Sequence, residues 1–246
     1  MPHTLVRPGK ALPADVTAIE GDILDPGSLG AAVEDASAIT TSPRLFARLT
    51  KMKLGRLISR VLATSSPPSR DHAPETRFIM ASTSHVYNPD SSHPGREADP
   101  VNPTLAYPAS KVEAENELRK SGLNWTVLRL PFVYGDEDGH LQSAPGLLAG
   151  MKWHPAQKLS LIHHRDIATA FKLALDGTMD GRIVNITDDA PTTIYEIAQI
   201  VNAAYEPSAK PLTNPWMLHM DGSLARSLGF RPTVSTVYQA REEDTL

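Results

Sequence analysis

The chain of 246 residues contains no cysteine. This excludes disulfides, thiolate metal sites and cysteine nucleophiles, and it favours a reducing compartment, so we expect a cytoplasmic protein. No apolar run approaches the ~20 residues of a membrane-spanning helix, and the first residues lack the layout of a signal peptide. The net charge is −4 and the basic residues are dispersed, so neither nucleic acid nor a membrane surface is an expected partner. The composition favours a small-molecule partner.

Clustered metal ligands are also missing from the sequence. The nine histidines are scattered, and one adjacent pair, His163 and His164, has side chains that point apart on either a helix or a strand. We therefore expect no metal site. Asp188 and Asp189 have two interpretations: they bind a cation, or they shape the turn before Pro191, and the turn is favoured.

Short β-rich runs alternate with amphipathic helical patterns along the chain. This alternation predicts a parallel sheet covered by helices on both faces, and apolar runs such as Phe78–Met80 suit strands buried on both sides. The expected strands are Thr4–Arg7, Val16–Glu20, Ala36–Thr40, Arg77–Ser82, Trp125–Leu130, Leu159–Ile162 and Arg182–Ile186. The expected helices are Ser28–Glu34, Leu45–Ala63, Thr104–Lys120, Arg165–Leu175 and Ile194–Ala204. Loops are expected at Gly139–Gly150 and Glu206–Pro215.

Tyr107 and Lys111 lie four residues apart near the start of the predicted helix Thr104–Lys120, so both side chains leave the same helical face. The ordinary pKa of a tyrosine is about 10, and a neighbouring cation lowers that pKa toward neutral pH. The pair is therefore a candidate for proton transfer. Taken alone, the same spacing is also typical of a solvated helix face.

A second segment, residues 80–87 (M-A-S-T-S-H-V-Y), runs from an apolar strand into a group of hydroxyls. Ligands of open α/β sheets bind at the carboxyl ends of the strands, so Ser82, Thr83 and Ser84 are candidates to contact a reacting group. The alternative is that these hydroxyls only end the strand. One loop is long enough to bring them together with the phenol of Tyr107.

These segments resemble those of the extended short-chain dehydrogenase/reductases, also called the NAD-dependent epimerase/dehydratase family. The resemblance covers nearly the whole chain. It is carried by A-S-T-S-H-V-Y at 81–87, T-L-A-Y-P-A-S-K at 104–111, L-R-L-P-F-V-Y-G at 128–135, L-I-H-H-R-D-I-A at 161–168, G-R-I-V-N-I-T at 181–187 and R-S-L-G-F-R-P at 226–232. It implies an α/β fold with a Rossmann-like, doubly wound parallel sheet and a small C-terminal substrate lobe.

The resemblance also implies a division into domains and the roles of single residues. Residues 1–134 and 159–187 would form the nucleotide-binding core, and residues 135–158 and 188–246 the lobe. Tyr107 would be the general acid/base, Lys111 would lower its pKa and bind the nicotinamide ribose, and Thr83 would hydrogen-bond the substrate oxygen. Ser82 and Ser84 are alternatives to Thr83, because a shift of one residue changes which hydroxyl faces the site.

The cofactor implied by the resemblance is NAD or NADP. Asp22 would accept from the adenine amino group and Ile23 would pack on the adenine ring. The nicotinamide end would be contacted by Ser82, Tyr107, Lys111, Pro131 and Val133. Arg7, at the end of a predicted strand, would favour NADP by binding its 2′-phosphate, or it is a solvated arginine.

The family's first strand and its G-x-x-G-x-x-G turn have no counterpart in the sequence, which begins at the family's second strand. That turn presents backbone amides and a helix N-terminus to the cofactor pyrophosphate. The missing strand is central in the order 3-2-1-4-5-6, so we expect an N-terminally truncated sheet in which the second and fourth strands separate or pair directly. Three explanations are open: a start at an internal methionine, a natural truncation, or a gap filled by a partner.

Two functions follow. The first is an NAD(P)-dependent oxidoreductase or epimerase/dehydratase that acts on a hydroxyl or carbonyl of a small substrate such as a nucleotide-sugar. The second, motivated by the absent glycine turn, is a noncatalytic nucleotide-sensing or scaffolding protein. The resemblance also implies a homodimer formed through the helices Thr104–Lys120 and Leu45–Ala63.

Overall fold

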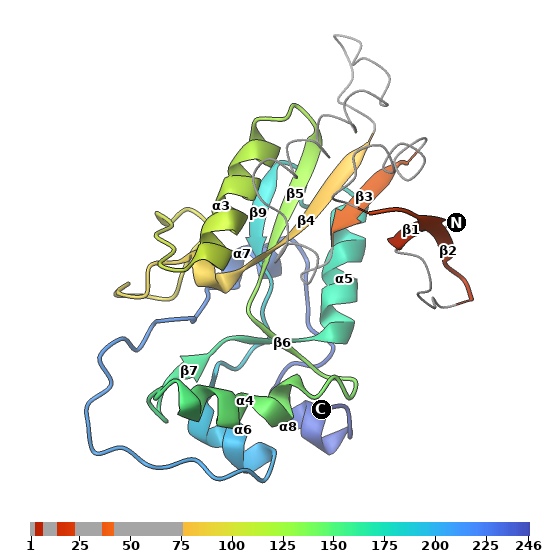
Figure 1. Cartoon of the computed structure of the whole chain (residues 1–246). Helices are drawn as coiled ribbons and strands as arrows, with labels where there is room; N and C mark the ends of the chain where they lie inside the picture. The colour runs from red at the N-terminus through yellow and green to blue at the C-terminus, as the bar shows by residue number, and fades with distance from the viewer. Residues whose placement is uncertain (1–2, 7–13, 23–35, 42–75) are drawn as a thin grey trace. The chain divides into compact units, whose positions relative to one another are not determined.

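The computed structural model describes residues 3–6, 14–22, 36–41 and 76–246 (Figure 1). The chain forms two compact units, which are described separately below. Unit 1 comprises residues 1–81, 110–127 and 180–182, and unit 2 comprises residues 82–109, 128–179 and 183–246. These units are not the predicted core and lobe, and that division stays a prediction. Two expected helices, Ser28–Glu34 and Leu45–Ala63, lie outside the described residues.

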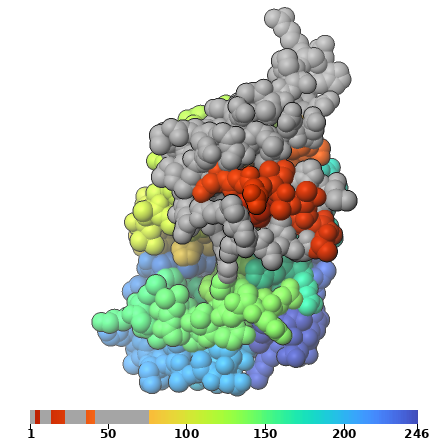
Figure 2. Space-filling model, turned by 45° about the vertical axis from the view of Figure 1, so that its right-hand side comes forward, coloured from red at the N-terminus to blue at the C-terminus, as the bar shows by residue number. Residues whose placement is uncertain are grey.

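Unit 1 begins with two short parallel strands. β1 (His3–Val6) pairs with β2 (Thr17–Glu20), with His3 opposite Thr17 and Val6 opposite Glu20. Both strands are visible in red on the surface in Figure 2. β3 (Ala38–Thr41) belongs to a different sheet, where it pairs in parallel with β4. β1 and β3 therefore belong to different sheets in the described part of the chain.

The larger sheet has the strand order β3-β4-β5-β9, with β4 at Arg77–Thr83, β5 at Asn124–Leu130 and β9 at Arg182–Asn185. The apolar side chains of β4 point to alternate faces of the sheet, and Phe78, Ile79 and Met80 are all fully buried. Both faces of this strand are therefore covered, as the apolar run predicted.

Helix α3 (Ala106–Arg119) places four of its residues on one buried face. These are Lys111, Ala114, Glu115 and Leu118, at the i, i+3, i+4 and i+7 spacing of a helical stripe. Two of the four are ionisable, so the sequence alone does not identify this face of the helix as the buried one. Glu115 is only 2% exposed, although a charged side chain ordinarily favours the solvated side of a helix.

Unit 2 contains short strands and most of the remaining helices. β6 (Phe132–Tyr134) pairs in parallel with β8 (Leu161–His163), and β7 (Lys158–Leu159) pairs antiparallel with β10 (Thr192–Thr193). The helices are α4 (His140–Gly150), α5 (His164–Leu175), α6 (Ile194–Ile200), α7 (Ser223–Ser227) and α8 (Val237–Glu242). Parallel strands connected by helices confirm the predicted α/β class.

Helix α4 corrects the expectation of a loop at Gly139–Gly150. Pro145 and the flanking glycines suggested irregular structure, yet Pro145 lies inside the helix. Leu141, Ala144, Pro145 and Leu148 are buried, and the first, second and last of them belong to the core of unit 2 together with residues of α6. Figure 1 shows α4 and α6 side by side. This burial offsets the backbone hydrogen bond that a proline cannot donate.

Candidate active site

The hydroxyl cluster lies where β4 ends. Ser82, Thr83 and Ser84 are 2%, 6% and 3% exposed. Thr83 has extended backbone and caps a 3₁₀ turn, η3 (Ser84–Val86), because its Oγ1 accepts the backbone N–H of His85 at 3.3 Å. The strand-ending and site-forming interpretations of these hydroxyls are therefore compatible.

Tyr107 lies in the first turn of α3, and its side chain shares a hydrogen bond with the side chain of Thr83. The structure thus brings together these two predicted catalytic residues of unit 2. Tyr107 as a whole is 37% exposed. Burial raises the pKa of Tyr107, and the hydrogen bond with Thr83 lowers it by a smaller amount.

Lys111 is fully buried, one helical turn after Tyr107 in the sequence of α3. Its Nζ donates to the backbone oxygen of Ala81 at 2.9 Å. Burial lowers the pKa of Lys111 to about 7, against the opposing effect of the nearby Glu115 carboxylate. We expected Lys111 to lower the pKa of Tyr107; instead burial raises this pKa, and the lowering effect comes from the hydrogen bond with Thr83.

The other predicted cofactor residues are only partly covered by the structure. Asp22 is half-buried and follows β2, directly after Gly21, whose N–H donates to Val6 at 2.9 Å. Arg7 and Ile23 lie outside the described residues. In unit 2, Pro131 is buried between β5 and β6, and Val133 is half-buried in β6.

Sequence reasoning missed a buried polar network around Tyr87. The phenol of Tyr87 donates to Asn185 Oδ1 at 2.6 Å, and Arg129 Nη1 donates to the phenol oxygen at 3.0 Å. The Arg129 guanidinium also lies 4.9 Å from the centre of the Tyr87 ring. Burial raises the pKa of Tyr87 to about 12 despite the arginine, so this tyrosine stays protonated. All three residues lie in segments that carry the family resemblance, at 81–87, 128–135 and 181–187. This was the sequence signal that could have identified them.

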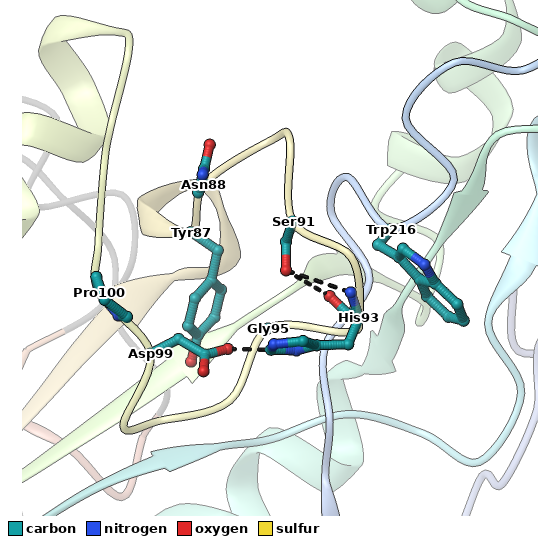
Figure 3. A pocket seen from close by; sticks show the side chains of 8 residues that line it. All are labelled: Tyr87, Asn88, Ser91, His93, Gly95, Asp99, Pro100 and Trp216. Atoms are coloured by element: carbon teal, nitrogen blue, oxygen red, sulfur yellow. Dashed lines mark hydrogen bonds and ion pairs between the residues drawn. The ribbon is translucent and has the colours of Figure 1, made fainter.

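A pocket of about 150 Å³ lies beside this network (Figure 3). Tyr87 and Pro100 form one side of it and Trp216 lies on the other, while His93 and Asp99 face each other at 3.6 Å. Gly95 lies so close to the Tyr87 ring that a Cβ would come within 2.5 Å of it. Only glycine therefore fits at this wall.

A second cavity, of about 370 Å³, has a different character. It is lined by the indole of Trp153 and by two lysines, Lys152 and Lys210, among others. The loop that forms it is fixed in part by His154, whose Nε2 is 2.8 Å from the oxygen of Lys210. An aromatic face beside two ammonium groups is suited to a base and an anionic phosphate.

No group of three or more His, Asp or Glu in the described part of the chain could hold a metal ion. Within the same residues, no helix is long and apolar enough to cross a membrane. The donors that are present suit a different ligand. Within unit 2, the hydroxyl of Thr83 and the phenol of Tyr107 are both groups that can hydrogen-bond a substrate oxygen. Hydroxyl groups of this kind also suit hydrogen bonds to the ribose of a dinucleotide.

The model of the NAD(P)H-binding family matches residues 3–148, which is more than half of the chain. The chain belongs to this family. A search of the curated proteins found no relative of similar sequence.

Several solved structures share the fold at low sequence identity. A putative NAD-dependent epimerase/dehydratase from Methylobacillus flagellatus is 17% identical, with a TM-score of 0.74, and the match covers 98% of this chain and 87% of that one. A dTDP-glucose 4,6-dehydratase double mutant from Streptomyces venezuelae, with NAD bound, is 23% identical, with a TM-score of 0.69 and coverages of 93% and 79%. A UDP-glucuronic acid 4-epimerase mutant from Bacillus cereus, also with NAD, is 18% identical, with a TM-score of 0.69 and coverages of 93% and 80%. The NAD(P)-binding class and the Rossmann-like fold that the resemblance implied are confirmed.

Proposed function

We propose that this protein is an NAD(P)-dependent oxidoreductase or epimerase/dehydratase that acts on a hydroxyl or carbonyl group of a small substrate. The observation that carries the proposal is the hydrogen bond between Thr83 and Tyr107, on a helix that buries Lys111 one turn later. Membership of the NAD(P)H-binding family supports the cofactor class. When bound, the cofactor would supply hydride transfer.

Each of the three residues has a role that its surroundings support. Tyr107 transfers the proton at its phenol oxygen, and its partial exposure leaves that oxygen accessible. Thr83 holds the phenol and the substrate oxygen by hydrogen bonds. Lys111, with a pKa of about 7, is part ammonium and part amine at neutral pH, and the proposed role of its ammonium form is to stabilise the tyrosinate during the reaction.

The residues that would hold the cofactor are those that the family resemblance implies. Lys111 would bind the nicotinamide ribose, Pro131 and Val133 would flank the nicotinamide, and Asp22 would bind the adenine end. Ser82 and Ile23 complete this proposed set. Arg7 would select NADP if it meets a 2′-phosphate.

We assign a nucleotide-sugar as the substrate because of the cavity that contains Trp153, Lys152 and Lys210. Its aromatic face and two lysines suit a nucleoside diphosphate, and it belongs to the same unit as Thr83 and Tyr107. The two neighbours named above as acting on dTDP-glucose and UDP-glucuronic acid support this class of substrate.

The test separates cofactor binding from proton transfer. The native protein is titrated with NADH and with NADPH, followed by fluorescence, and turnover is measured with UDP-glucose, UDP-glucuronic acid and dTDP-glucose. Tyr107→Phe keeps the aromatic ring and removes only the hydroxyl, so it is expected to retain most of the cofactor affinity and to lose about 10²- to 10⁴-fold in kcat. Tyr195→Phe, the same change at an exposed tyrosine of α6, is the matched control and keeps native turnover.

Two results would contradict the proposal. Full turnover by Tyr107→Phe would remove the tyrosine from the mechanism. Failure of the native chain to bind either nucleotide would favour the noncatalytic scaffolding function instead.

A further inference from the structure

A cavity of about 330 Å³ in unit 2 has no part in the proposed reaction. It lies between the turn that follows β9 and the segment that leads into α7. Its polar lining includes Asp188, Asp189, His219, Asp221 and Arg226. Three of these side chains have a buried polar atom without a hydrogen-bond partner: Asp188 Oδ2, His219 Nδ1 and Arg226 Nη1. Buried polar atoms are rarely left unpaired, so their concentration around one cavity points to a ligand.

Asp188 is the most unusual of the three. It is 3% exposed, and its Oδ1 accepts the N–H of Ala190 at 3.3 Å. The carboxylate therefore does shape the turn before Pro191, as one sequence interpretation held. That bond uses one oxygen, and Oδ2 has no partner. The second interpretation, binding of a cation, is thus compatible with the first.

The charged side chains that line the cavity, apart from Asp188, each pair with a side chain of opposite charge. Arg226 donates twice to Asp189 Oδ1, at 2.6 and 3.2 Å, so these two charges pair with each other. Asp221 has an ion pair with Arg96 at 3.4 Å. Burial lowers the pKa of His219, so its ring is neutral at neutral pH. An added positive charge would therefore be stabilised at Asp188.

We propose that this cavity binds a small organic ammonium compound that also carries a hydroxyl group. The ammonium donates to Asp188 Oδ2. The hydroxyl oxygen accepts from Arg226 Nη1, and the hydroxyl hydrogen is donated to His219 Nδ1. An organic cation is favoured over a metal ion, because no group of three or more acidic or histidine side chains in the described chain could hold a metal.

The first experiment compares three probes of similar size and different charge. Ethanolamine, ethylene glycol and glycolate are each titrated into the native chain by calorimetry. Ethanolamine is expected to bind with a Kd of about 1 mM. Ethylene glycol and glycolate are expected to bind at least about 10-fold more weakly, because neither supplies a positive charge to Asp188.

Two variants locate the site. Asp188→Asn keeps the shape of the side chain and its bond to Ala190, and it is expected to weaken ethanolamine binding at least about 10-fold. Glu206→Gln removes one negative charge from an exposed position of the same unit and is expected to bind as the native chain does. Equal binding of the three probes, no binding of ethanolamine, or equal loss in both variants would overturn the proposal.

A second readout uses the native chain alone. Burial, with the nearby carboxylates of Asp189 and Asp166, raises the pKa of Asp188 to about 8, and Arg226 opposes this rise. The phenol of Tyr134 is also buried near this carboxyl and stays protonated.

An ammonium ligand favours the ionised carboxylate, so binding at about pH 7 should release a proton. The apparent enthalpy would then depend on the ionisation enthalpy of the buffer in the native chain, and not in Asp188→Asn. A buffer-independent enthalpy in the native chain would contradict the assignment of Asp188.

Discussion

Two buried polar side chains of unit 2, Asn185 and Asp188, lie three residues apart in the sequence. They differ in whether all their polar atoms have hydrogen-bond partners. Asn185, at the end of β9, is fully buried, and its side chain accepts from Tyr87 and donates to the carbonyls of Gly95 and Asp221. Asp188 is almost as buried but leaves Oδ2 without a partner. Asn185 therefore connects three segments of the unit by hydrogen bonds, whereas one oxygen of Asp188 can still accept a hydrogen bond.

The largest expected effect comes from removing the satisfied side chain. Asn185→Ala removes one hydrogen bond from the phenol of Tyr87 and one from each of the two carbonyls, so we expect a loss of about 3 kcal/mol in the free energy of unfolding, measured with urea. Asn214→Ala, which removes an exposed bond to Asp90, is the control and should change stability by less than about 0.5 kcal/mol. Similar losses in the two variants would show that the network around Asn185 adds little.

The unsatisfied side chain should respond in the opposite direction. The folded pKa of Asp188 is about 8, above the unfolded value of about 3.9, so between these pH values the folded chain binds more protons. The stability contributed by this proton is present below about pH 4 and is lost as the pH rises through about 8. Asp188→Asn should therefore be about 2 kcal/mol more stable than the native chain at about pH 9. A native chain that is equally stable or more stable there would contradict the unpaired state of Oδ2.

Lys111 in unit 1 sharpens the comparison, because it is a buried ion with a hydrogen-bond partner and the opposite pH response. Its folded pKa of about 7 lies below the unfolded value of about 10.4, so the unfolded chain binds more protons between these pH values. Stability should rise by about 1 kcal/mol from about pH 7 to about pH 8 because of this lysine. Lys111→Met should lack the rise, as measured by urea unfolding at both pH values. Parallel pH curves of native and variant would show that the lysine is not desolvated.

The sequence predicted elements whose signal is local and missed those that depend on distant contacts. The apolar run Phe78–Met80 identified β4, and the spacing of Tyr107 and Lys111 identified α3. Helix α4 was missed because Pro145 has a strong local preference against helices, which burial against α6 overrides. The roles of Thr83, Tyr107 and Lys111, the homodimer and the choice between NAD and NADP stay predictions.

Much of the candidate site required the structure for similar reasons. The sequence offered both interpretations of Asp188, but its unpaired oxygen depends on Arg226, which lies far along the chain and pairs with Asp189 instead. The burial of Glu115 could not be read from its own helix, because a charged residue normally favours the solvated face.

The contact between Gly135 and His163 has an evolutionary consequence. Gly135 has a φ of 111°, and a Cβ built on it would lie 2.1 Å from His163 Nε2. That nitrogen is itself 2.9 Å from the backbone oxygen of Thr245, so the ring has little freedom to move away. The two positions are therefore under joint selection. Among diverged descendants of this gene, a side chain larger than hydrogen at 135 should be found only where 163 has exchanged histidine for a smaller residue.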